Sequence, residues 1–97
     1  MKEINMVMKY ERDALMNDLK LHPVEVRFKK VNGEMRVMRC TLMKDRLPVN
    51  DDQFEQLEEQ HKKPENLNTV VVWDLQANGW RSFRVDSVEY AQIIDGY

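Results

Sequence analysis

Two turn signals, each flanked by segments with the pattern of β-strands, limit the fold of this chain more than any other feature. The first is Asn32-Gly33, between the alternating segment 24–31 and the return segment 35–43. Both residue types tolerate the positive φ that tight hairpin turns require. In the register that gives one apolar face, three pairs are opposite each other: Val24 and Leu42, Val26 and Cys40, and Phe28 and Met38. This register predicts a three-residue loop or a bulge near the turn.

The second turn signal is Ala77-Asn78-Gly79. It follows the apolar run 70–75, which is typical of a buried strand. After the turn, residues 80–85 place Arg81, Phe83 and Val85 on one face and Trp80, Ser82 and Arg84 on the other. A turn at Asp86-Ser87 follows, and the short apolar segment VEYAQII is expected to form a closing strand rather than one helical turn.

Residues 8–20 are predicted to form an amphipathic helix before the first hairpin. Met8, Leu15 and Leu19 follow the spacing that places side chains on one helical face, and Met16 widens the apolar stripe. Pro23 ends the pattern, because the residue before a proline is disfavoured in the helical conformation.

Residues 49–68 form an acidic insert between the two hairpins. One interpretation is a short helix that Asp51 caps and that carries Phe54, Leu57 and His61 on one side. The other is a mobile acidic loop. The sequence leaves both open.

A single domain over residues 1–97 accommodates all of these segments. We expect a mainly β fold, a five-stranded SH3/Sm-like barrel with an N-terminal helix laid against it, since closing a small sheet removes its exposed edges. The barrel would comprise residues 24–48 and 69–94.

Charge is distributed unevenly along the chain, although the formal net charge is only −2. Residues 27–46 hold seven basic and two acidic residues, a local charge of +5, and residues 51–65 hold six acidic and two basic residues, a local charge of −4. The basic residues are Arg27, Lys29, Lys30, Arg36, Arg39, Lys44 and Arg46. They form either a phosphate-binding patch or the ordinary solvated face of a hairpin.

The sequence favours a cytoplasmic protein without a membrane partner. No apolar run approaches the roughly 20 residues that cross a bilayer, and the charged N-terminal segment lacks the pattern of a signal peptide. The single cysteine, Cys40, cannot form an intramolecular disulfide, which suits a reducing compartment.

Groups that support catalysis are few in this sequence. His22 and His61 lie outside any metalloprotease spacing, and one cysteine provides no zinc-binding set. Cys40 shares an apolar strand face with Met38 and Leu42, so we expect it in the core. We therefore expect neither enzymatic activity nor a metal or cofactor.

Two stretches carry a family likeness: VVVWDLQANGWRSFRVDSV, which contains the Arg-x-Phe-Arg segment, and VRFKKVNGEMRVMRCTLMKDRLP. They resemble the hairpins of WYL domains, and more closely those of the stand-alone Sm-like SH3-barrel relatives encoded mainly by bacteriophages. The likeness covers residues 24–48 and 69–94, and leaves out the helix and the acidic insert. It implies a family associated with binding nucleic acid or nucleotide-like ligands, with regulation, and, for a phage protein, with the host cytoplasm.

Trp80, Arg81 and Arg84 are the main candidate ligand-binding residues. At the rim of a small barrel, the Arg81 fork can reach a phosphate or carboxylate. Trp80 beside Arg84 can form a stacking platform for a base. Trp73 lies across the hairpin from this group, and Arg27, Lys29 and Arg39 could support it.

Two structural alternatives compete with this interpretation. In one, both tryptophans are core or cap residues and the arginines pair with Asp74 and Asp86. In the other, tryptophan and arginine anchor a protein–protein surface.

The first hypothesis for function is a small phage-type accessory or regulatory protein that binds single-stranded nucleic acid or a nucleotide-like ligand by stacking and phosphate contacts. The alternative is an interaction module that contacts a host or phage protein through its helix and acidic insert. A homodimer is a further expectation, because the apolar faces of the helix and of residues 70–73 need cover.

Overall fold

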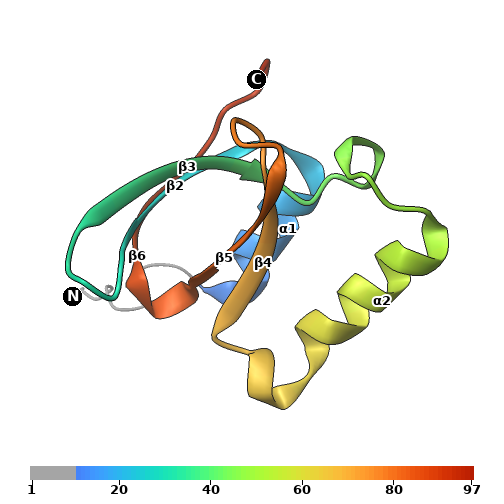
Figure 1. The fold of residues 1–97 in the computed structure, drawn as a ribbon, viewed down its shortest axis with the longest axis horizontal. Helices are drawn as coiled ribbons and strands as arrows, with labels where there is room; N and C mark the ends of the chain where they lie inside the picture. The colour runs from blue at the N-terminus through green and yellow to red at the C-terminus, as the bar shows by residue number, and fades with distance from the viewer. Residues whose placement is uncertain (1–10) are drawn as a thin grey trace.

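A computed structural model describes residues 11–97 as one curved sheet flanked by two helices (Figure 1). In chain order the elements are α1 (Arg12–Leu21), β2 (Val24–Lys29), β3 (Met35–Thr41), η1 (Lys44–Arg46), α2 (Asp51–Lys62), η2 (Pro64–Asn66), β4 (Thr69–Asp74), β5 (Gly79–Arg84), η3 (Val85–Ser87) and β6 (Val88–Ile93). The η elements are single 3-10 turns. The predicted N-terminal helix corresponds to α1, and positions 8–10 of that prediction lie outside the described residues.

The five strands form one sheet in the order β5-β4-β3-β2-β6, with antiparallel neighbours throughout. The prediction of five strands in two hairpins and a closing strand is therefore confirmed. Figure 1 shows the sheet curling so that η3 carries the chain from β5, at one edge, to β6, at the other. Val85, predicted as the last residue of a strand, belongs to η3 and is still buried.

The predicted register of the first hairpin is wrong by two residues. Val24 is opposite Cys40, and Phe28 is opposite Arg36. An even shift keeps the same side chains on the inner face, which explains why the apolar pattern alone could not detect it. Lys30 N–H donates to Glu34 O (2.8 Å), so residues 31–33 form the predicted three-residue loop. Gly33 provides the positive φ (92°) at its end.

The second hairpin pairs Trp73 with Trp80 and Val70 with Phe83. The turn of this hairpin explains why the buried strand β4 ends with an acidic residue, Asp74. Asp74 Oδ1 accepts hydrogen bonds from Gln76 N–H (2.9 Å) and Ala77 N–H (3.0 Å), so the buried Asp74 side chain closes the turn.

The core lies inside the curled sheet and under α1. Its buried apolar residues are Leu15, Met16, Leu19, Val24, Val26, Phe28, Met38, Cys40, Leu42, Leu47, Val70, Val72, Phe83, Val85 and Val88. The expectation for Cys40 is confirmed: burial, with a smaller contribution from Asp74, raises the pKa of its thiol to about 12. The thiol is therefore protonated at neutral pH.

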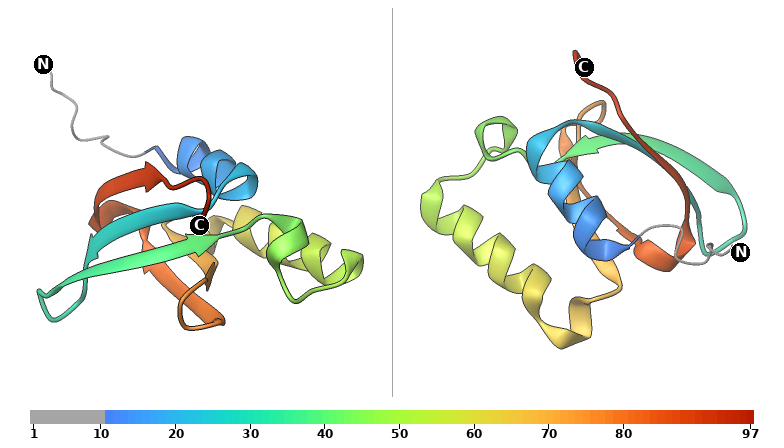
Figure 2. Two further views of the ribbon diagram at one scale, coloured as in Figure 1. Left: turned by 90° about the horizontal axis from the view of Figure 1, so that it is seen from above. Right: turned by 180° about the vertical axis from the view of Figure 1, so that it is seen from behind.

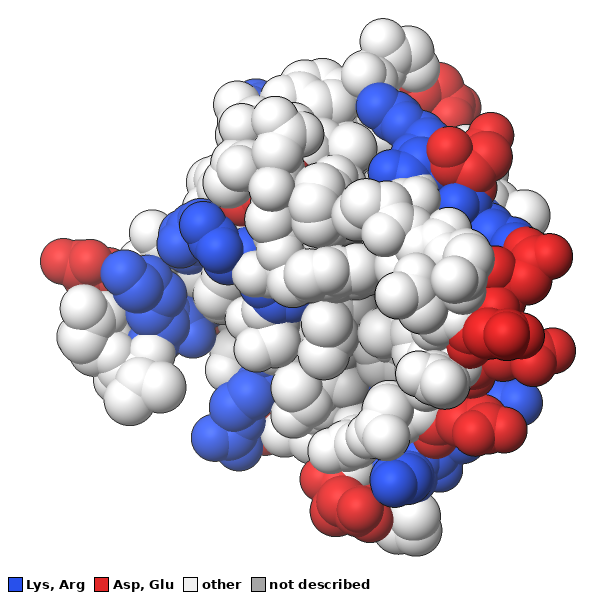
Figure 3. All heavy atoms as spheres, turned by 45° about the vertical axis from the view of Figure 1, so that its right-hand side comes forward, with Lys and Arg blue, Asp and Glu red and all other residues white. Residues whose placement is uncertain are grey.

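The acidic insert contains the helix α2, which lies beside β4 (Figure 2). The predicted cap was wrong by one residue. Asn50 is the N-cap, with its side chain accepting from Gln53 N–H (2.8 Å) while the Gln53 side chain accepts from Asn50 N–H (2.9 Å). This reciprocal pair needs an amide or hydroxyl three residues before a Gln or Glu. Phe54 and Leu57 pack against the core, and Figure 3 shows acidic side chains gathered along the exposed side of the molecule that α2 forms.

Besides this packing, hydrogen bonds that involve the side chains of Arg12 and His61 attach α2 and the turn after it to the rest of the molecule. Arg12 of α1 donates from Nη2 to the carbonyl oxygens of His61 (2.9 Å), Asn66 (3.3 Å) and Thr69 (3.1 Å). The buried His61 accepts at Nε2 from Val71 N–H (3.0 Å). Burial, followed by the charges of Arg12 and Lys20, lowers the pKa of His61 below its usual 6.5.

In the part of the chain from residue 11 onward, no helix has the length and apolar character needed to span a membrane.

Candidate anion-binding site

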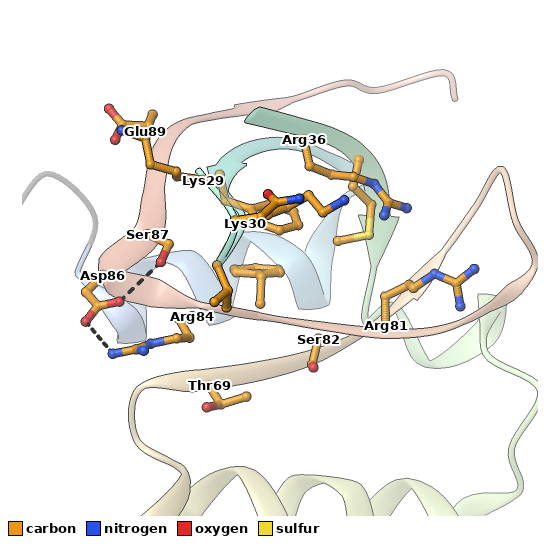
Figure 4. Close-up of a pocket in the computed structure, with 15 residues that line it drawn as sticks. Lys29, Lys30, Arg36, Thr69, Arg81, Ser82, Arg84, Asp86, Ser87 and Glu89 are labelled. Carbon is orange, nitrogen blue, oxygen red and sulfur yellow. Dashed lines mark hydrogen bonds and ion pairs between the residues drawn. The ribbon is translucent and has the colours of Figure 1, made fainter. Parts of the chain in front are cut away.

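An open hollow of about 1040 Å³ separates the β2–β3 hairpin from β5 and η3 (Figure 4). It exists because β3 and β4 pair at only two positions, Cys40 with Asp74 and Thr41 with Trp73. Beyond these pairs the hairpin extends away from the β4–β5 pair (Figure 1). We call this space the hollow. Its walls are Phe28, Lys29, Lys30, Val31, Asn32, Arg36, Met38, Thr69, Arg81, Ser82, Phe83, Arg84, Asp86, Ser87 and Glu89.

The floor of the hollow is apolar and built from stacked, buried side chains. Phe28 from β2 and Phe83 from β5 stack with their ring centroids 5.5 Å apart and their planes at 25°. Both rings and the neighbouring Met38 are buried in the core. The floor therefore fixes the backbone on both sides of the hollow at the point where its charged residues begin.

The walls carry five basic side chains and two acidic ones. The basic residues are Lys29, Lys30, Arg36, Arg81 and Arg84, and the acidic residues are Asp86 and Glu89. In Figure 4, Arg36 and Arg81 lie toward one end and Arg84, Asp86 and Ser87 toward the other. The excess of positive charge favours an anionic ligand.

Three of the five cations already have carboxylate neighbours. Arg84 Nη2 lies 3.2 Å from Asp86 Oδ2, Arg36 Nη2 lies 3.6 Å from Asp74 Oδ2, and Lys30 Nζ lies 3.8 Å from Glu34 Oε1.

Lys29 and Arg81 form no ion pair with another described residue. Arg81 Nη1 donates to the carbonyl oxygen of Trp80 (3.1 Å), a contact that leaves its other donors available. Within residues 11–97, these are the two cations of the hollow that can bind an anion without first breaking an ion pair.

The structure brings three of the seven candidate residues together at the hollow: Lys29, Arg81 and Arg84. The two tryptophans lie on the other face of the β4–β5 hairpin. There they form a T-shaped pair with ring centroids 5.2 Å apart. Trp80 and Arg84 share a strand face as predicted, so Arg84 borders the hollow from the side of β5 opposite Arg81 (Figure 4), whereas Trp80 contacts Trp73 and does not line the hollow.

Arg27 and Arg39 also lie away from the hollow. The Arg27 guanidinium stacks over the Tyr90 ring at 4.9 Å. Arg39 is 3.2 Å from Glu25, the residue opposite it on β2, and stacks over Tyr97 at 5.6 Å. The competing expectation that arginines pair with Asp74 and Asp86 holds for Arg84 with Asp86, whereas Asp74 pairs with Arg36.

Two basic residues of the hollow, Lys30 and Arg36, were absent from the predicted site. Both belong to the basic stretch 27–46. The signal for Arg36 was strand alternation: two residues before Met38, it shares the inner face of β3 with Met38 and Cys40, and it lines the hollow with Phe83 and Arg81. Among residues 11–97, no group of three His, Cys, Asp or Glu residues is placed to hold a metal ion.

A family model described as WYL_2, Sm-like SH3 beta-barrel fold, matches residues 12–88. The chain belongs to this family. The match confirms the resemblance and the predicted barrel class, and it extends over α1 and α2, which the resemblance had left out. It also includes every basic residue of the hollow. Comparisons with curated proteins and with solved structures find no match.

Proposed function

We propose that this WYL_2 protein binds single-stranded nucleic acid or a nucleotide-like ligand in the hollow, as a phage-type accessory or regulatory protein that carries out no covalent chemistry. One observation carries the proposal: five basic residues from β2, the hairpin loop, β3 and β5 line an open space that has an apolar floor. The two cations without ion pairs among the described residues, Lys29 and Arg81, come from opposite walls.

The binding mechanism follows from the types of side chain. Arg81 offers a planar fork that matches two phosphate oxygens, and Lys29 offers a compact charge that adapts to one. A sugar or base can pack on the apolar floor that Phe28 and Phe83 form. Ser87 also lines this space, and its hydroxyl group can exchange hydrogen bonds with ligand oxygens.

The proposal is tested by fluorescence anisotropy with labelled single-stranded DNA and RNA oligonucleotides and with mononucleotides as competitors. Lys29→Gln/Arg81→Gln removes the two available cations and should weaken binding at least tenfold. Lys62→Gln/Lys63→Gln removes the same charge at the exposed end of α2 and should change the affinity less than twofold. Equal losses in both variants would assign the binding to overall charge and contradict a site in the hollow.

A further inference from the structure

Opposite charges lie at opposite ends of the molecule. The described residues extend 42 Å along the longest axis, with the β2–β3 hairpin toward one end and α2 toward the other (Figure 1). Figure 3 shows mainly basic side chains on the projecting left side and a line of acidic side chains, with basic ones between them, along the right side. The acidic surface of each copy therefore faces away from the basic hollow of the same copy.

The acidic surface of α2 contains a stripe of three carboxylates that form no ion pair with any of residues 11–97. Asp51 and Glu58 pair with Lys44 (2.8 Å) and Lys20 (2.9 Å). Asp52, Glu55 and Glu59 are exposed and form no ion pair with another described residue. Their spacing of three and four residues places them on one side of α2, over about 10 Å at a rise of 1.5 Å per residue. The stripe therefore presents three negative charges in a row on the exposed side of α2.

We infer that the acidic stripe of α2 from a second copy of the chain occupies the hollow and competes there with the anionic ligand. Charge complementarity carries the inference, because the carboxylates of the stripe and the cations Lys29 and Arg81 are opposite in charge and none of them forms an ion pair within the described part of the chain. The stripe and the hollow face different directions on one copy, so the contact is head-to-tail between copies. The small net charge of −2 adds little repulsion between copies.

This inference rests on the proposed function in one respect: the cations that hold the second copy are those proposed to hold the phosphates. Self-association would therefore reduce the number of free hollows as protein concentration rises. A ligand would release copies from one another, and high salt would weaken both contacts.

Sedimentation velocity at low and high salt, over a hundredfold range of protein concentration, tests the inference. The wild-type protein should increase in average mass with concentration at low salt and remain a monomer at 0.5 M salt. The hollow variant, Lys29→Gln/Arg81→Gln, and the stripe variant, Asp52→Asn/Glu55→Gln/Glu59→Gln, should each remain monomeric at low salt. All five residues are exposed, and circular dichroism checks that both variants fold.

A mixture of the two variants gives the sharpest result. The hollow variant keeps an intact stripe and the stripe variant keeps an intact hollow, so only one contact can form. We expect a 1:1 dimer that grows no further. A monomeric wild-type protein at low salt, or self-association of either variant alone, would overturn the inference. Oligonucleotide binding by dilute wild-type protein is measured separately, and its absence would count against the proposed function instead.

Discussion

Arg84 and its neighbour Asp86 show how one carboxylate can adjust the strength of an anion site. The two side chains form an exposed ion pair at 3.2 Å, so a ligand must compete with Asp86 for the Arg84 guanidinium. Asp86→Asn removes the competing charge while it keeps the size of the side chain. We predict severalfold tighter oligonucleotide binding, measured by anisotropy, and no change for the matched variant Asp45→Asn, which lies outside the hollow. Weaker binding in Asp86→Asn would mean that the carboxylate contacts the ligand directly.

Trp80 tests whether the tryptophan pair stabilises the fold or binds the ligand. Its side chain is 39% exposed and meets Trp73 edge to face outside the hollow. We predict that Trp80→Ala lowers the free energy of unfolding by roughly 1–2 kcal/mol, from the lost aromatic contact and partial burial, and leaves oligonucleotide affinity unchanged. Urea unfolding and anisotropy give the two readings. A large loss of affinity at unchanged stability would restore the stacking platform that the sequence indicated.

At the level of elements, the start of α2 depends on one amide side chain. Asn50 bonds Gln53 in both directions, whereas Asp51 contributes an exposed ion pair with Lys44. Asn50→Ala should therefore cost about 1 kcal/mol of unfolding free energy, and Asp51→Ala should cost clearly less. Chemical denaturation of both variants measures the difference. A larger loss for Asp51→Ala would contradict the capping assignment.

The attachment of α2 to β4 should weaken in mild acid. The unfolded chain protonates His61 near its usual pKa of 6.5, and the folded chain protonates it at a lower pH because of burial and the charge of Arg12. Between those two values the unfolded state binds more protons, so stability is complete above about pH 6.5 and falls as pH falls. Protonation also removes the acceptor for Val71 N–H.

The measurement is the melting temperature from pH 7.5 to pH 5. His61→Gln keeps an acceptor for Val71 N–H but cannot titrate, so its melting temperature should change much less over this range. The carboxylates of Asp51 and Glu58, whose pKa values are lowered by ion pairs with Lys44 and Lys20, affect stability only at more acidic pH. An identical pH dependence in the wild type and the variant would contradict the role of His61.

The sequence predicted best the elements whose position is determined by a few neighbouring residues. Asn32-Gly33 and Asn78-Gly79 determine where the hairpins turn, and the alternating apolar residues determine which faces are buried. Register was harder to predict, because pairing Phe28 with Arg36 or with Met38 buries the same strand face. For α2, the acidic composition favoured neither helix nor loop, and the decisive signal was the spacing of Asn50 and Gln53.

The candidate site was less predictable because the hollow is a property of the whole molecule. It results from the divergence of the β2–β3 hairpin from β4 and β5 after two paired positions, and no short segment encodes that divergence. Arg81 and Lys29 were among the predicted site residues, and strand alternation with Met38 also places Arg36 on the inner face, although the sequence analysis did not select it. The tryptophans attracted attention as rare residues, although they contact each other on the opposite face of the hairpin.

The salt dependence of oligonucleotide binding tests the central claim, the hollow as a phosphate site, most directly. For single strands the slope of log K against log salt is about −0.7 for each phosphate neutralised. If Lys29, Arg81 and one further basic residue of the hollow each neutralise a phosphate, the slope for the wild-type protein is about −2. The slope for Lys29→Gln/Arg81→Gln should then be shallower by about 1.4. A wild-type protein that does not bind oligonucleotides at low salt, or a slope that is unchanged in the variant, would contradict the account.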